Sequence, residues 1–175
     1  MALRDCGKIE VGKYKRTQGT EFARNVAMLS FYLVGVNTVD LFQVDPYKDG
    51  RISYDRAKTA SRRTDNAFIP IKVEPEALSL VEKYRDPAGE RVFCFYKMYR
   101  DHDGLTKALN TGLKHIAAYL KWIEGVTFIW MRYSWANIAR NDCRIPVDDV
   151  AQGMNHSGNG HKVTDIYWSK GLAHY

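Results

Sequence analysis

The chain has 175 residues, of which 45% are hydrophobic and 13% aromatic, and its 26 Lys and Arg side chains outnumber its 20 Asp and Glu side chains. This hydrophobic content excludes an intrinsically disordered chain, and the length predicts one domain. The formal net charge of +6 favours an acidic partner, most simply nucleic acid, although a merely basic protein would have the same composition.

Cysteine content and hydropathy bear on the compartment. The cysteines (Cys6, Cys94 and Cys143) are odd in number and form no CxxC pair, so neither a disulfide framework nor a thiolate zinc site is predicted. The longest apolar run, residues 26–36, falls short of the roughly 18 residues that cross a bilayer. The N-terminal segment also lacks the apolar region of a signal peptide. We therefore expect a cytoplasmic protein with no membrane partner.

The first part of the chain predicts two helices. Residues 1–19 are polar and basic and are expected to form a flexible lead-in, followed by one domain over residues 20–175. Thr20 is expected to cap the first helix, and Gly35 separates it from the second. The apolar positions at helical spacing are Phe22, Val26, Leu29 and Leu33 in the first helix, and Val36, Val39, Leu41 and Phe42 in the second.

Two segments that alternate with period two, RISYDR (51–56) and FIPIKV (68–73), flank a polar and basic loop, AKTASRRTDNA (57–67). This pattern predicts two antiparallel strands. The preceding DPYKDG (45–50) lacks the alternating ligands and closing glutamate of a calcium loop, so it is predicted to be a turn.

The second half is predicted to be mostly helical, with Pro75 and Pro146 each opening a helix. RVFCFYKMY (91–99) is expected to be a strand or extended core, and TFIWMRYSWANIARND (127–142) the core helix of the domain. A further helix has Leu105, Leu109, Leu113, Ile116 and Leu120 on one face. NHSGNGH (155–161) is predicted to be a loop, and residues 162–169 a short terminal element. The predicted fold class is mostly α with a small antiparallel β-sheet (α+β).

These segments, in this order, resemble the catalytic domain of the tyrosine recombinases, the phage-integrase family, and most closely integrases of mobile elements such as conjugative transposons. The similarity covers roughly residues 20–168. The strings that carry it are EFARNVAMLSFYLVGVNTVDL for the opening helix pair, GRISYDRAKT and IPIKVEPEA for the sheet, MRYSWANIA for the arginine-bearing helix, and MNHSGNGHKVTDIY for the tyrosine-bearing end. A family integrase usually carries an N-terminal DNA-clamping domain before its catalytic domain. Because the similarity here begins at about residue 20, the resemblance implies that this domain is absent from the chain.

The resemblance implies site-specific DNA recombination, in which DNA strands are cleaved and rejoined through a covalent 3′-phosphotyrosyl intermediate. It places the nucleophile at Tyr167, a phosphate-binding guanidinium at Arg132, a proton-sharing imidazole at His156 and the acid for the leaving 5′ oxygen at Lys58. Double-stranded DNA is the implied partner, with self-assembly on DNA as a tetramer and association with the nucleoid. Arg62, Arg63 and Lys162 are candidate DNA contacts. No cofactor or metal is implied.

Two positions depart from the family pattern. Asn37 stands where the family's first arginine is expected, and Ile129 stands where the first histidine of its H-x-x-R motif is expected. Arg62, Arg63 or Arg24 would then have to supply the missing guanidinium. These departures keep open a catalytically weakened DNA-binding or assembly module of recombinase fold. A basic helical adaptor that binds protein through aromatic faces is a further alternative.

Each site residue also has a simpler interpretation. Lys58 is alternatively a solvated turn lysine, and Arg132 a cation that stacks on neighbouring aromatic rings. Asn37 is more readily interpreted as a capping or turn residue than as a catalytic one, and Tyr167 alone would be a core residue. His156 and His161 could be a pair of metal ligands, but no Asp, Glu or Cys nearby completes a ligand set.

Overall fold

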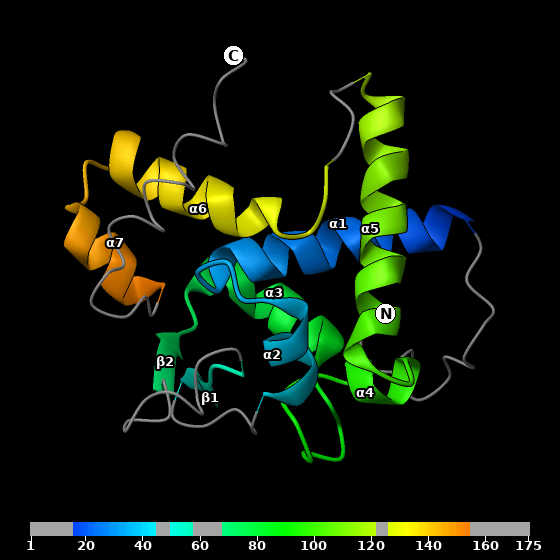
Figure 1. The fold of residues 1–175 in the computed structure, drawn as a ribbon. Helices are drawn as coiled ribbons and strands as arrows, with labels where there is room; N and C mark the ends of the chain where they lie inside the picture. Colours follow the sequence, from blue (N-terminus) through cyan, green and yellow to red (C-terminus); the bar gives the residue numbers. More distant parts are fainter. Residues whose placement is uncertain (1–15, 45–49, 58–67, 122–125, 155–175) are drawn as a thin grey trace.

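The computed structural model of the chain describes residues 16–44, 50–57, 68–121 and 126–154, which fold into helices and one small sheet (Figure 1). The elements are α1 (Arg16–Tyr32), α2 (Thr38–Gln43), β1 (Arg51–Asp55), β2 (Phe68–Lys72), α3 (Pro75–Tyr84), α4 (Phe95–Met98), α5 (His102–Tyr119), α6 (Trp130–Asn141) and α7 (Val147–Gly153). The predicted class, mostly α with a small antiparallel sheet, is confirmed for these residues.

The core is built around α1 and α5, which cross each other (Figure 1). Gly112 allows this close approach, since a Cβ atom on Gly112 would lie 2.4 Å from the Cβ of Ala23. Leu29 of α1 and Leu109 of α5 are fully buried. The expectation that residues 127–142 form the core helix is therefore wrong. α6 contacts α1, and its buried residues are Arg132, Ala136 and Ala139.

The helix α1 begins at Arg16, so Thr20 lies inside it and does not cap it as expected. Arg and Gln have good helix propensity, and tertiary packing supports the added turn. A Cβ atom on Gly112 of α5 would lie 2.8 Å from the carbonyl oxygen of Gly19, which shows that this turn of α1 reaches the crossing.

The two predicted strands are confirmed. β1 and β2 pair antiparallel, with Arg51 opposite Lys72 and Asp55 opposite Phe68. Their burial alternates as period two requires. Among the described residues these two strands form the sheet, which differs from a parallel doubly wound arrangement.

Residues 91–99 form core, as expected, but not a strand. Only an isolated bridge between Arg85 and Phe93 has strand pairing, and α4 follows at once. The segment packs aromatic rings into the core, where Phe93 stacks on Phe95 with ring centroids 5.3 Å apart. Phe95 also contacts Phe22 of α1, so ring packing determines the local backbone.

The helices over residues 75–84, 102–119 and 147–153 agree with the predicted ones, and Pro146 precedes α7 as its N-cap. Leu120 is an exception, because it lies beyond the end of α5 and is 43% exposed. This end of α5 projects beyond the other described helices (Figure 1). No helix in the described ranges is both long and apolar enough to cross a membrane.

Candidate functional site

The turn between α1 and α2 brings the chain close to α6. Val34 and Gly35 both adopt left-handed backbone conformations, with φ of 62° and 68°. Such a conformation costs a β-branched residue energy and is free for glycine. The turn is closed by the Gly35 amide, which donates to the Ser30 carbonyl at 2.8 Å, and by the Ser30 hydroxyl, which donates to the Val36 carbonyl at 2.8 Å.

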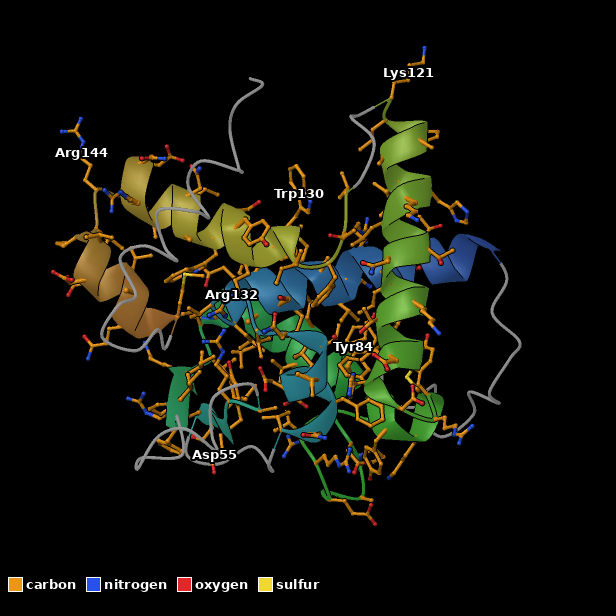
Figure 2. The ribbon with its side chains drawn as sticks, in the orientation of Figure 1. Asp55, Tyr84, Lys121, Trp130, Arg132 and Arg144 are labelled. Atoms are coloured by element: carbon orange, nitrogen blue, oxygen red, sulfur yellow. The ribbon has the colours of Figure 1, made fainter. Side chains whose placement is uncertain are left out.

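Arg132 extends from α6 into the interior and is only 3% exposed (Figure 2). Its Nη1 donates to the carbonyl of Gly35 at 3.1 Å, and its Nη2 donates to the carbonyl of Met154 at 2.5 Å. One guanidinium thus joins the α1–α2 turn to the end of α7. Burial of such a charge is tolerated only where hydrogen bonds and opposite charges compensate it.

A second arginine reaches the same acceptor. Arg56 follows β1 directly, is 5% exposed, and donates from Nη1 to the Met154 carbonyl at 3.2 Å. Met154 is the C-cap of α7, so its carbonyl belongs to the group that a helix end leaves without an intrahelical donor. Two guanidinium groups therefore converge on one carbonyl oxygen.

Asp40 of α2 supplies the negative charge in this interior and is 4% exposed. Its Oδ1 accepts a hydrogen bond from the Ala57 amide at 3.0 Å. Burial raises the pKa of the Asp40 carboxyl, and the Ala57 hydrogen bond and the charges of Arg56 and Arg132 only partly offset this effect. Burial, with the nearby Asp40 charge, also raises the pKa of Tyr54.

Together these contacts form a buried polar cluster, defined here as Asp40, Tyr54, Arg56 and Arg132 with the Met154 carbonyl. It connects α2 and the end of β1 with α6 and the end of α7, which lie in two distant parts of the sequence. Chemically, the cluster offers guanidinium donors that converge on an oxygen atom, with a carboxylate nearby to balance their charge.

Of the predicted site residues, Arg132 is described and lies in this cluster. Asn37 is the half-buried N-cap of α2, and within the described residues its side chain makes no capping hydrogen bond. Its carbonyl accepts from the Leu41 amide at 2.9 Å. Ile129 is the N-cap of α6 and already has helical backbone angles. Arg24 is exposed on α1, and its guanidinium donates to the side chain of Asn25.

The other predicted site residues lie outside the described ranges: Lys58, Arg62, Arg63, His156, Lys162 and Tyr167. The chain leading to two of them is described. Ala57, which directly precedes Lys58, is held by Asp40, and Met154, two residues before His156, is held by Arg56 and Arg132. The family resemblance further leads us to expect that Lys58, His156 and Arg132 converge on one basic face, and this stays a prediction.

The sequence interpretation missed Asp40, Tyr54 and Arg56. A signal for Arg56 was available, because the alternation that buries Ile52 and Tyr54 in β1 continues to position 56 and predicts a buried side chain there. Asp40 interrupts the apolar face of its helix, which is a weaker signal. Neither pattern indicates the shared acceptor, since Met154 lies 98 residues from Arg56.

Metal ligation has no support in the described ranges, where no group of three His, Cys, Asp or Glu side chains is placed to hold an ion.

No protein-family model, curated protein or solved structure is significantly similar to this chain.

Proposed function

We propose that the chain is the catalytic domain of a site-specific DNA recombinase or integrase of the tyrosine type, carried by a mobile genetic element. The observation that supports this most is that Arg132 and Arg56 hold together the chain segments that lead to Asn37, His156 and Lys58. The Arg132 guanidinium binds the carbonyl of Gly35, two residues before Asn37, and that of Met154, two residues before His156. Arg56, two residues before Lys58, binds the same Met154 carbonyl.

The chemistry follows from the residue types. The phenol oxygen of Tyr167 attacks the scissile phosphorus, a phosphorus–oxygen bond to the tyrosine forms, and the bond to the 5′ oxygen breaks. His156 accepts the phenol proton, and Lys58 protonates the departing 5′ oxygen. Arg132 stabilises the charge on the non-bridging oxygens. Attack by a 5′ hydroxyl reverses the step and rejoins the strands.

Double-stranded DNA is the proposed partner, with assembly of four copies on two recombining sites. The net charge of +6 supports a polyanionic partner. Action on chromosomal DNA would place the protein at the nucleoid.

A second candidate function is a DNA-binding or assembly module of recombinase fold that has lost most of its catalytic power. The burial of Arg132 favours it, because a guanidinium bound to two backbone carbonyls serves to hold the fold together. The Asn37 and Ile129 departures favour it as well.

Trapping on nicked DNA separates the two candidates. A pool of duplexes with randomised sequence around a nick is mixed with the protein. Cleavage next to the nick releases a short fragment, which diffuses away and leaves the protein covalently attached. The recombinase proposal predicts a denaturant-resistant complex enriched for particular sequences, absent in Tyr167→Phe. Tyr119→Phe is the matched control, because Tyr119 is 87% exposed at the end of α5. Binding without any trapped complex would favour the inactive module.

A further inference from the structure

Arg56 and Arg132 share one acceptor, the carbonyl oxygen of Met154, although Arg56 follows β1 and Arg132 lies in α6. Arg56 is nearly as buried as Arg132, at 5% against 3% exposure. A buried arginine at the end of a two-strand sheet is uncommon, since Arg is rarely buried unless it is paired. The burial of Arg56 therefore indicates a structural or functional role, because an arginine that only kept the protein soluble would be exposed.

The end of β1 is held from two sides. The Arg56 side chain is bound to the end of α7 through Met154, and the Ala57 amide is bound to α2 through the Asp40 carboxylate at 3.0 Å. These bonds fix two successive residues at the point where β1 ends. By contrast, Arg51 at the other end of β1 is exposed.

We propose that Arg56 is a positioning residue of the active site. It holds the end of β1 against the end of α7, next to Arg132, and so sets where the chain that continues with Lys58 starts. This inference rests on the proposed function, in which Lys58 protonates the leaving 5′ oxygen. Arg56 itself does not contact the DNA in this proposal.

A sulfur atom in place of the 5′ bridging oxygen tests this role. A thiol has a pKa near 8.5, far below that of an alcohol, so a thiolate leaves without needing a proton. A variant whose defect lies in delivery of that proton is rescued by the sulfur substrate. A methylphosphonate at the scissile position instead removes charge from a non-bridging oxygen, and rescues defects in charge stabilisation.

The experiment measures covalent trapping rates on nicked duplexes of a sequence enriched from the random pool, in the oxygen, sulfur and methylphosphonate forms. Arg56→Met keeps the length of the side chain and removes its donors, and Arg56→Lys keeps the charge. Arg51→Met is the matched control, because Arg51 is exposed at the other end of β1. General acid catalysis contributes roughly 10²–10⁴-fold, so a partly misplaced acid should slow Arg56→Met on the oxygen substrate by roughly 10- to 100-fold.

We expect the sulfur substrate to restore the trapping rate of Arg56→Met to within about threefold of wild type, as it should for Lys58→Ala. Arg56→Lys should show a smaller loss with the same rescue, which keeps the test valid if Arg56→Met does not fold. Rescue by methylphosphonate alone would contradict the proposal and place Arg56 at the phosphate. A loss that neither substrate rescues, or no loss at all, would also contradict it. Failure of the wild-type protein to trap any substrate would instead reject the proposed function.

Discussion

Gly35 and Arg132 lie in direct contact although 97 residues separate them. The Gly35 carbonyl accepts from Arg132 Nη1 at 3.1 Å, and a Cβ atom on Gly35 would lie 2.5 Å from the Arg132 Cα. The α1–α2 turn therefore rests directly on the backbone of α6. Only glycine satisfies both the contact and the left-handed φ of 68°.

Gly35→Ala should destabilise the fold strongly. The left-handed conformation costs roughly 1–2 kcal/mol, and the steric clash adds about 1–3 kcal/mol. Gly89→Ala is the matched control, because Gly89 has a φ of 72° but nothing within 4 Å of the added Cβ. Urea unfolding should therefore give a clearly larger loss for Gly35→Ala. Equal losses of unfolding free energy in the two variants would show that the close contact with Arg132 does not contribute to the destabilisation.

Asp86 holds the loop between α3 and α4 and gives the fold a sensitivity to acid. Its carboxylate accepts from Lys97 Nζ at 2.6 Å, from the Tyr96 hydroxyl at 2.7 Å, and from the amides of Ala88 and Glu90. Burial raises the pKa of Asp86, but the hydrogen bonds and the Lys97 charge outweigh this effect and lower it to about 2. The ionised carboxylate is thus stabilised by folding.

An unfolded aspartate has a pKa of about 3.9, so this contribution is fully present above that pH and is lost as the pH falls toward 2. It is on the order of 2 kcal/mol. Asp86→Asn should lower the free energy of unfolding at pH 7 and flatten its decline between about pH 4 and pH 2. Glu82→Gln, in an exposed pair with Arg85, should change little. If the free energy of unfolding of Asp86→Asn declined between about pH 4 and pH 2 as steeply as that of the wild type, this assignment would be wrong.

Asn37→Arg tests whether position 37, where the recombinases that the sequence resembles have an arginine, limits the proposed catalysis. Asn37 occupies the N-cap position of α2 and lies two residues from Gly35, whose carbonyl binds Arg132. Loss of one charge-stabilising donor typically costs about 10²–10³-fold in rate, so an arginine here should raise the trapping rate by up to roughly that factor. Gln43→Arg adds the same charge at the exposed end of α2. If both variants accelerate trapping equally, general charge attraction is responsible and the assignment of position 37 is wrong.

DNA binding should weaken steeply with salt. Each phosphate contact contributes about 0.9 to the slope of log affinity against log salt concentration. Titration of a labelled duplex at about 50 mM and about 200 mM salt measures this slope. A net charge of +6 leads us to expect several such contacts. Salt-insensitive binding, or none, would favour the protein-binding adaptor.

The elements of the fold were largely predictable because they follow local periodicity. The alternation at 51–56 and 68–73 predicted the hairpin, and Pro75 and Pro146 marked helix starts. The start of α1 and the helix α4 were not predicted. Both depend on contacts between distant segments, at Gly112 and in the aromatic core, that a local pattern does not contain.

The site was less predictable. The resemblance to the recombinases pointed to Arg132. It did not predict that the Arg132 guanidinium would bind the backbone carbonyls of Gly35 and Met154. Asp40 and Arg56 were missed because buried charges interrupt the apolar patterns that sequence interpretation follows. Their pairing depends on the tertiary fold, and only the period-two alternation of β1 pointed to Arg56.

The most direct measurement of the central claim is the identity of the residue that carries the DNA. Protein trapped on the nicked duplex pool is digested with protease and nuclease, and mass spectrometry locates the residual nucleotide. We expect a 3′-phosphotyrosyl nucleotide on Tyr167, with no adduct in Tyr167→Phe and an unchanged adduct in Tyr119→Phe. An adduct on another residue, or duplex binding without any adduct, would contradict it.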